Sequence, residues 1–331
     1  MIQVEKLVKH YGDKYAVNDV TFTVENGEIV GLLGPNGAGK STIMNIITGY
    51  ISTSSGSVKI NGFDILDNAH EAKQNIGYLP EVPPLYPDMT VMEYLCFVYS
   101  LKRCTFNRKK HLDEICEVAK LSDVKGRLIK NLSKGYKQRV GIAQALVGNP
   151  QTIILDEPTV GLDPKQIIEI RNLIRTLGRD HSVILSTHIL SEVQAVCDRV
   201  VIINKGKLVA NERTEDISTI VGGNRRTSAK ICGPSDQILA ALKSLQGVVR
   251  AEMLSEKELD STTYIIESAA GIDIRKPLFF MLAEKGWPLI GIEALGISLE
   301  DIFISMTDRP GGALKKKKKS IKVAQTGASP N

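Results

Sequence analysis

The first residues that could do chemistry form a glycine-rich segment near the N-terminus. Residues 34–41 read Gly-Pro-Asn-Gly-Ala-Gly-Lys-Ser and fit the pattern G-x-x-x-x-G-K-[ST]. Small residues let backbone N–H groups approach phosphate oxygens closely, and the start of a helix adds free amides and a favourable dipole. We expect Lys40 to reach the β- and γ-phosphates of a nucleotide and Ser41 to bind Mg²⁺. The residues predicted to contact the nucleotide are Gly34, Pro35, Asn36, Gly37, Ala38, Gly39, Lys40, Ser41 and Thr42.

A second segment ends in two adjacent acids. Residues 153–157 read Ile-Ile-Leu-Asp-Glu, an apolar run of buried-strand length followed by carboxylates. A carboxylate at the end of a strand can face the phosphate loop and hold Mg²⁺, which suits Asp156. The next side chain points elsewhere, so Glu157 is placed to polarise an attacking water. Alone this segment could equally cap a helix, but beside a phosphate loop it predicts nucleotide hydrolysis.

A third segment carries a family resemblance. Residues 132–139, Leu-Ser-Lys-Gly-Tyr-Lys-Gln-Arg, resemble the signature loop of ATP-binding-cassette (ABC) proteins. The remaining landmarks of that family follow in order over residues 1 to about 215. By this resemblance, the adenine-stacking aromatic, the Q-loop residue, the D-loop and the switch histidine correspond to Tyr11, Glu81, residues 161–164 (Gly-Leu-Asp-Pro) and His188.

The resemblance also implies how these residues cooperate. In ABC proteins ATP lies between two subunits, and the signature loop of one chain faces the γ-phosphate held by the other. Here Ser133 and the amides near Gly135 would begin a helix and form that second anion-binding end. Catalysis would then fall to Lys40, Glu157 and His188, which neutralise the phosphates, orient water and hold the γ-phosphate. One chain has one phosphate loop and one signature, so we expect a second ATP-binding subunit, as a homodimer.

Three positions depart from the family pattern. Lys134 and Tyr136 stand where ABC proteins usually have Gly and Gln, and Glu81 stands where Gln is usual. Ser133 and Gly135 remain, so the contact with phosphate is expected to survive. The Glu81 carboxylate can still reach Mg²⁺ and is kept as a candidate metal ligand, although it adds negative charge beside the phosphates.

Hydrophobic patterns predict an α/β fold that positions these segments. Strands are expected within residues 1–35, and the phosphate loop stands between an apolar strand and a helical pattern, which argues against a merely conformational glycine turn. Residues from about 83 to 148 have helical spacing and predict an inserted helical lobe. Strands alternating with helices over residues 152–204 predict a parallel sheet covered on both faces. We therefore expect a P-loop NTPase cassette of the ABC type over residues 1–215.

The chain after about residue 216 has the pattern of a second domain. Residues 216–226 are predicted as a linker, and residues 227–308 as a small α+β domain with the ferredoxin-like order βαββαβ. This domain ends in SLEDIFISM, an amphipathic segment with a Ser-x-x-Asp cap at Ser298. The extension resembles that of ATP subunits of bacterial exporters, with gliding-motility subunits as the nearest likeness. Residues 309–331 are predicted to be a basic, disordered tail.

Composition and charge exclude several other classes. The 331 residues are 43% hydrophobic and 24% charged, as in globular proteins. The net charge of +5 comes from the tail, because without its six lysines 36 basic residues face 37 acidic ones, so we expect no nucleic-acid partner. Five scattered cysteines lack metal-binding spacing and suit a reducing cytosol. No segment reaches the roughly 20 apolar residues of a membrane span, and the first ten residues lack the apolar core of a secretory signal.

These observations predict the ATP-hydrolysing subunit of a bacterial ABC exporter-type transporter. It would bind ATP and Mg²⁺, and it would act on separate membrane-spanning permease subunits from the cytoplasmic side, peripheral on the inner face of the cell membrane. The alternative is a soluble ABC ATPase acting on the ribosome or DNA, but the second cassette or long coiled coil of such proteins is absent from the sequence. A binding-only pseudo-ATPase is disfavoured because Glu157 and His188 are present.

Overall fold

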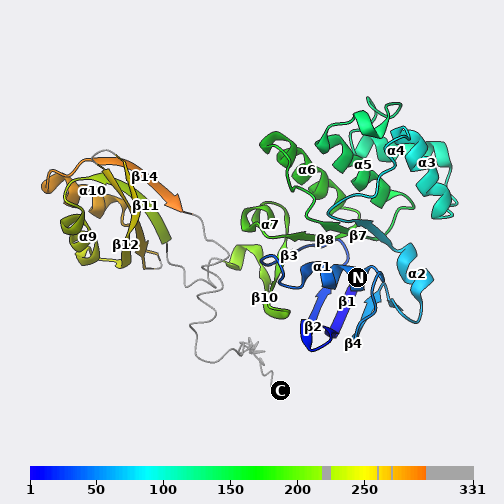
Figure 1. Ribbon diagram of the computed structural model, residues 1–331, viewed down its shortest axis with the longest axis horizontal. Helices are drawn as coiled ribbons and strands as arrows, with labels where there is room; N and C mark the ends of the chain where they lie inside the picture. Colours follow the sequence, from blue (N-terminus) through cyan, green and yellow to red (C-terminus); the bar gives the residue numbers. More distant parts are fainter. Residues whose placement is uncertain (218–224, 259–260, 270, 296–331) are drawn as a thin grey trace, which may run out of the picture.

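A six-stranded sheet forms the centre of the N-terminal part of the chain. The computed structural model describes residues 1–217, 225–258, 261–269 and 271–295 (Figure 1). In spatial order the strands are β10 (Lys207–Arg213), β9 (Arg199–Asn204), β3 (Ile29–Leu33), β8 (Ser182–Thr187), β7 (Thr152–Asp156) and β6 (Ile76–Leu79). Only the β10–β9 pair is antiparallel. Strands β3, β7 and β8 are buried at every residue, which explains their unbroken apolar runs.

One face of this sheet shares a hydrophobic core with helix α1 (Lys40–Ile47) and a second sheet. The second sheet is antiparallel, in the order β2 (Lys14–Val24), β1 (Ile2–Tyr11), β4 (Ser55–Ile60) and β5 (Phe63–Asp64). The core joins Val30 and Ile154 of the parallel strands to Ile43 of α1 and Phe22 of β2. Strands were expected within residues 1–35, but the separation of β1 and β2 from β3 into a second sheet is a finding of the structure.

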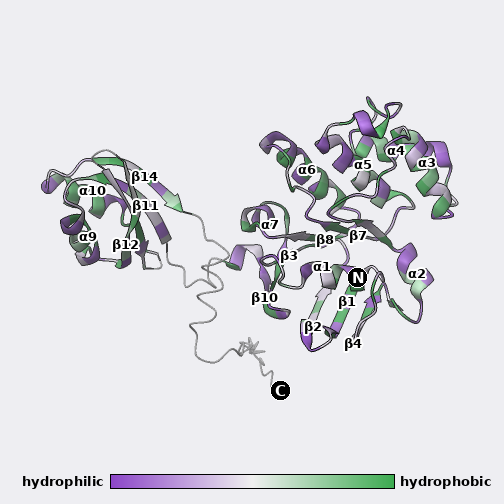
Figure 2. Ribbon diagram, in the orientation of Figure 1, coloured by the Kyte–Doolittle hydropathy of each residue, from purple (hydrophilic) through white to green (hydrophobic). Residues whose placement is uncertain are grey.

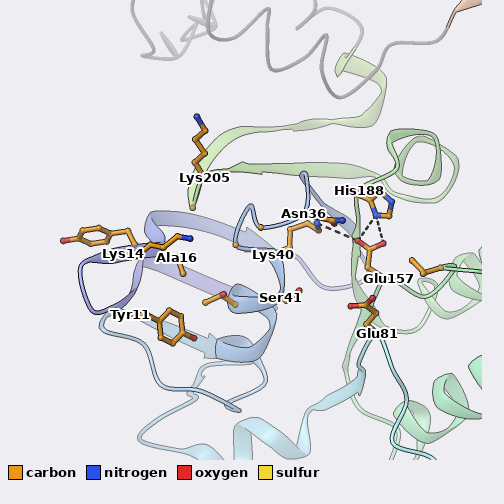
Figure 3. Close-up of a pocket in the computed structure, with 16 residues that line it drawn as sticks. Tyr11, Lys14, Ala16, Asn36, Lys40, Ser41, Glu81, Glu157, His188 and Lys205 are labelled. Carbon is orange, nitrogen blue, oxygen red and sulfur yellow. Dashed lines mark hydrogen bonds and ion pairs between the residues drawn. The ribbon is translucent and has the colours of Figure 1, made fainter.

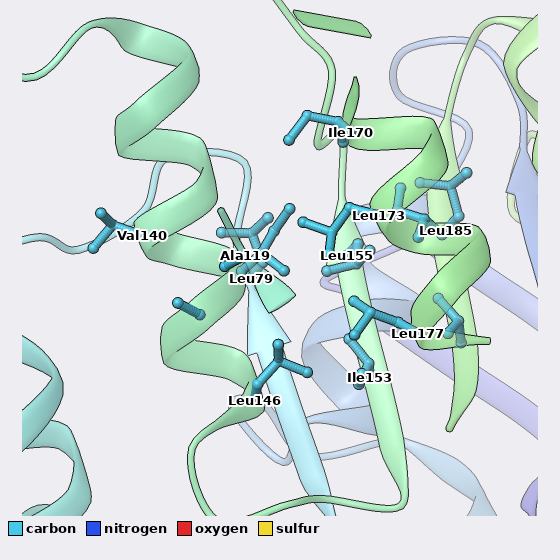
Figure 4. Packing of buried hydrophobic residues seen from close by; sticks show 14 of the residues in the cluster. Leu79, Ala119, Val140, Leu146, Ile153, Leu155, Ile170, Leu173, Leu177 and Leu185 are labelled. Atoms are coloured by element: carbon cyan, nitrogen blue, oxygen red, sulfur yellow. The ribbon is translucent and has the colours of Figure 1, made fainter. Parts of the chain in front are cut away.

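The opposite face shares its core with the helices. These are α3 (Val91–Leu101), α4 (Arg108–Val118), α5 (Lys134–Leu146), α6 (Pro164–Leu177) and α7 (Leu190–Val196). Figure 4 shows Ile153 and Leu155 of β7 between α5 and α6. Along α6, hydrophobic and hydrophilic residues are mixed (Figure 2), as expected for a helix with one buried face. Helices α3, α4 and α5 lie within the lobe predicted at 83–148, and the remaining short helices here are α2 (Ala69–Gln74), η1 (Ile129–Asn131) and η2 (Thr214–Asp216).

Side-chain caps fix where the helices near the signature residues begin. Ser133 precedes α5, and its hydroxyl accepts a hydrogen bond from the Tyr136 N–H at 3.4 Å. Asp163 precedes α6, and its carboxylate accepts one from the Gln166 N–H at 2.9 Å. Pro164 occupies the first turn of α6, where no backbone N–H is needed. Both helix starts are therefore encoded locally.

The C-terminal unit has its own sheet and its own core. Its elements are β11 (Arg225–Cys232), α9 (Ser235–Ser244), β12 (Val248–Glu258), β13 (Ser261–Ser268), α10 (Arg275–Glu284) and β14 (Leu289–Leu295). The sheet is antiparallel in the order β12-β13-β11-β14, which is the ferredoxin-like arrangement predicted from the element order. Strand β11 begins at Arg225, inside the predicted linker, because Arg225 and Arg226 pair with β13.

Two predictions fall on other parts of the chain. The capped segment at Ser298 and the tail at 309–331 lie outside the described residues. In the part of the chain that the structure describes, no helix combines the length and the apolar character needed to cross a membrane.

Candidate functional site

An open pocket of about 670 Å³ lies where the parallel strands end (Figure 3). The phosphate loop follows β3, and Glu157 and His188 directly follow β7 and β8. Glu81 follows β6 by two residues. Because parallel strands end at the same edge of a sheet, four distant segments meet here. The predicted residues that line the pocket are Tyr11, Asn36, Gly37, Gly39, Lys40, Ser41, Thr42, Glu81, Glu157 and His188.

The phosphate loop is clamped between two other segments, which explains two of its glycines. A Cβ atom at Gly34 would lie 2.2 Å from the Ile203 carbonyl oxygen, and one at Gly39 would lie 2.5 Å from that of Ala16. Gly39 also has φ +109°, a conformation that side chains disfavour. The Gly206 N–H donates to the Ala38 carbonyl at 2.8 Å. The segments around Ala16 and residues 203–206 thus pack against the phosphate loop, and the loop also lines the pocket.

Lys40 is buried, and its ammonium group donates hydrogen bonds to carbonyl oxygens of its own phosphate loop. Its Nζ donates to the carbonyl oxygens of Gly34 at 2.8 Å and Pro35 at 3.3 Å, and it lies 3.8 Å from Glu157 Oε1. Only 6% of Lys40 is exposed. An ammonium group held this way is pre-positioned at the loop, and phosphate oxygens would offer it stronger, charge-assisted partners than the carbonyls.

Glu157 and His188 form the polar centre of the pocket. His188 Nδ1 lies 3.0 Å from Glu157 Oε2 and 3.1 Å from Oε1. Burial raises the pKa of Glu157, while the bond to His188 opposes that rise. An ionised Glu157 carboxylate only accepts, so in that state His188 donates from Nδ1, and its Nε2 is not engaged by Glu157. Glu157 has φ +47°, a strained conformation for a residue other than glycine.

Asp156 lies behind the pocket lining and has the properties expected of a metal ligand. It is 4% exposed, and its Oδ1 has no hydrogen-bond partner among the described residues. Burial raises the pKa of Asp156, and the nearby Glu81 carboxylate adds to the rise. A Mg²⁺ ion would satisfy this oxygen, so the residues present fit the ion. The described residues contain no group of three or more His, Cys, Asp or Glu side chains placed to hold a metal. Mg²⁺ would therefore need ligands from phosphates and water, as is usual for this ion.

The signature residues do not join the pocket of their own chain. Ser133 is exposed at the start of α5, and Gly135 is buried against the Gln166 side chain. Of the two departures within the signature loop, Tyr136 donates from its hydroxyl to Asp123 at 3.0 Å. The side chain of Lys134 lies across Gly161. Tyr136 thus has a hydrogen-bond partner in its own chain, and Lys134 lies close to Gly161 of its own chain.

Several pocket residues were missed by sequence reasoning. Lys14, Tyr15 and Ala16 follow the hairpin between β1 and β2, and Lys205 and Gly206 form the turn between β9 and β10. Val160, after β7, is the remaining one. The Lys-Gly turn is visible in the sequence, but its position beside the phosphate loop depends on contacts between distant segments. The missed lysines add positive charge to the rim of the pocket. Tyr11 lies at the same rim and is 55% exposed.

Three features together define a P-loop nucleoside triphosphatase. They are a phosphate loop after the parallel strand β3, a buried acid pair at the end of the parallel strand β7, and a helical lobe on one face of the sheet. Comparison with known proteins specifies the family. The family model for ABC transporters matches residues 17–160. The linearmycin resistance ATP-binding protein LnrL of Bacillus subtilis (strain 168) is 33% identical over 317 residues, spanning 93% of this chain and 99% of the relative.

Two further matches agree. The bacitracin transport ATP-binding protein BcrA of Bacillus licheniformis is 39% identical and spans 63% of this chain and 68% of the relative. The solved dimer of the ATP-binding cassette MJ0796 in a post-hydrolysis state, bound to ADP and Pi, superposes with a TM-score of 0.59. It is 28% identical and covers 65% of this chain and 99% of that chain. This chain belongs to the ABC transporter family, as an ATP-binding subunit that hydrolyses ATP to drive transport.

Proposed function

We propose that this subunit powers an export-type transporter and that Glu157 activates the water that attacks ATP. The observation that carries the catalytic part is the position of Glu157 in the phosphate-loop pocket, 3.8 Å from Lys40 and 3.0 Å from His188. The match to LnrL, which is named as a linearmycin resistance ATP-binding protein, extends over the C-terminal unit, and the export assignment is supported by a further relative. The Haemophilus influenzae LptB protein, named as a lipopolysaccharide export ATP-binding protein, is 36% identical over 222 residues. The likeness to gliding-motility subunits stays a prediction.

The site residues predicted from the sequence have distinct roles in this proposal. Tyr11 stacks on the adenine, and the loop amides with Lys40 bind the phosphates. Ser41, Asp156 and Glu81 would hold Mg²⁺, and the ion would neutralise phosphate charge. Glu157 accepts a hydrogen bond from the attacking water and polarises it toward the γ-phosphate. His188 donates from Nδ1 to Glu157, and in its imidazolium form it also donates from Nε2 to a γ-phosphate oxygen.

The proposal includes a second copy of the chain and a membrane partner. Ser133 is exposed at a helix start and lies outside the phosphate-loop pocket of its own chain, which suits a contact with ATP held by another subunit. Separate permease subunits would place the pair at the inner face of the membrane. In the same proposal residues 1–215 form the ATP-binding domain, and residues 227–308 form the C-terminal domain after a linker at 216–226.

Substitution of Glu157 by Gln tests the proposal. This change keeps the size of the side chain but removes the carboxylate, so ATP turnover should fall by about two to four orders of magnitude, as for loss of a general base. Binding should persist, and ATP should shift the variant from monomer to dimer in size-exclusion chromatography with light scattering. ADP should not, because it lacks the γ-phosphate. Turnover near that of the wild type, or equal dimerisation with ADP, would contradict the mechanism; a failure to dimerise calls for repetition with the permease present.

A further inference from the structure

A buried carboxylate outside the pocket joins the two segments that carry Glu157 and His188. Glu192 on α7 is 3% exposed. One of its oxygens accepts a hydrogen bond from the Thr159 hydroxyl at 2.7 Å, and the other accepts one from the Thr187 hydroxyl at 2.9 Å. The nearest cation is Arg171, whose Nη2 lies 3.9 Å away. Glu192 therefore has two short, buried bonds and one distant charge partner.

The two threonines are placed directly beside the reacting groups. Thr159 follows Glu157 by two residues in the loop after β7, and it is 5% exposed. Thr187 is the last residue of β8 and directly precedes His188. Its hydroxyl oxygen also accepts from the Ile189 N–H at 3.2 Å, on the other side of His188. One carboxylate thus connects the backbone that presents Glu157 to the backbone that presents His188.

A purely structural role explains this arrangement poorly. Burying a carboxylate costs free energy that two hydroxyl bonds offset only in part, and an apolar side chain could fill the same space. The strained φ of +47° at Glu157, in contrast, requires surroundings that hold the loop in place. Buried polar partners with defined directions can do this, whereas apolar packing tolerates sliding.

We propose that Glu192 is a positioning residue for ATP hydrolysis, which holds Glu157 and His188 in register through Thr159 and Thr187. This inference rests on the proposed role of Glu157. It predicts that loosening the link slows the chemical step while ATP binding, which depends on the phosphate loop, is retained.

Thr159→Val is the sharpest variant, because it removes one hydroxyl and keeps the shape of the side chain. We expect kcat to fall about tenfold or more, with the KM and Kd for MgATP within about twofold of the wild type. The matched control is Thr152→Val at the opposite end of β7. Thr152 is fully buried, and its hydroxyl has no hydrogen-bond partner among the described residues, so kcat should not change.

Comparing Glu192→Gln with Glu192→Ala separates the effect of the two hydrogen bonds from the effect of the negative charge. The Gln amide can accept from Thr159 and donate to Thr187, so it should retain much of kcat, whereas Ala should lose as much as Thr159→Val does. A double-mutant cycle gives a readout that stability alone does not move. In the Glu157→Gln background, adding Thr159→Val should cause no further loss of single-turnover rate, because both changes act on the same group.

The outcomes separate this inference from the proposed function. If the wild-type protein turns over ATP and Glu157→Gln does not reduce it, the role of Glu157 fails. If Glu157→Gln reduces turnover but Thr159→Val behaves like Thr152→Val, or its loss adds fully to that of Glu157→Gln, the role of Glu192 is overturned. Circular dichroism at the assay temperature reports the folded fraction, and Thr159→Val decides the question even where Glu192→Ala does not fold.

Discussion

At the scale of the residue, the site contains ionisable side chains that are already buried in the nucleotide-free protein. Lys40, Asp156 and Glu157 are each less than a tenth exposed, and burial raises the pKa of both acids. Such groups lower the stability of the nucleotide-free protein relative to neutral side chains. They are useful in a dry pocket, where charges act strongly on a substrate.

Lys40→Ala should abolish tight binding of MgATP. The buried ammonium would face the phosphates of bound ATP, and a charge-assisted bond of this kind contributes roughly 2–3 kcal/mol. Titration with a fluorescent nucleotide measures the change. Lys59→Ala on the exposed side of β4 serves as the control and should bind like the wild type. Affinity retained within about threefold in Lys40→Ala would contradict the assigned role.

At the scale of the element, the helical lobe contains a partly buried lysine, Lys102. Its burial disfavours the charged form of the side chain. Lys102 follows α3 and donates from Nζ to the Val147 carbonyl at 2.8 Å, after α5. Burial lowers the pKa of Lys102 to about 8. The titratable groups that interact with this ammonium are Cys104 and His111. The contact joins the C-terminal ends of two helices of the lobe, so its protonation is coupled to the stability of the lobe.

Comparison of the wild type with Lys102→Met should show this coupling. The folded-state pKa of about 8 lies below the ordinary value of 10.5, so the unfolded state binds more protons between these values. The free energy of unfolding of the wild type, relative to the variant, should therefore rise by about 2–4 kcal/mol from pH 8 to pH 10.5. Urea unfolding followed by far-UV circular dichroism measures it. Parallel pH profiles for the two proteins would show that Lys102 is not perturbed.

At the scale of the whole molecule, the described chain has separate cores. The cassette sheets and helices share two clusters, and the ferredoxin-like unit has a third, built from residues such as Ile231, Leu242 and Tyr264. The single tryptophan, Trp287, packs against this third core. Its fluorescence can therefore follow the C-terminal unit alone.

MgATP should stabilise the cassette and leave the C-terminal unit unchanged. At an ATP concentration of about 100 times Kd, the cassette should gain about 2.7 kcal/mol, seen as a shift of the main circular dichroism transition to higher urea. The transition of Trp287 fluorescence should not move, because ATP binds the other unit. In Lys40→Ala neither transition should respond to ATP. Equal shifts of both signals in the wild type would show that the two units unfold as one.

Mixing two inactive variants tests whether the ATP site is shared between chains. Lys40→Ala removes the phosphate-loop cation, and Ser133→Arg blocks the start of α5. A mixed dimer has one site in which both changes meet and one site in which Lys40 and Ser133 are both intact. Mixing should restore ATP turnover that neither variant shows alone. Turnover no greater than the sum of the separate variants would contradict a shared site.

The sequence by itself determined the features that depend on neighbouring residues. The glycine-rich loop, the acids at the end of β7 and the caps at Ser133 and Asp163 follow from patterns a few residues long. The helical lobe and the order βαββαβ follow from periodicity, which reports the buried face of each element. Family membership also followed, since several such local patterns occur in one order.

Only the tertiary structure decided which distant segments touch. The first strands form a separate antiparallel layer, and Lys14 and Lys205 lie at the rim of the pocket. Lys40 contacts Glu157, and Glu192 joins Thr159 to Thr187. None of these contacts follows from spacing, because each depends on how strands, helices and turns that are distant in the sequence pack together. Periodicity encodes which face is buried, and packing alone selects the partner that covers it.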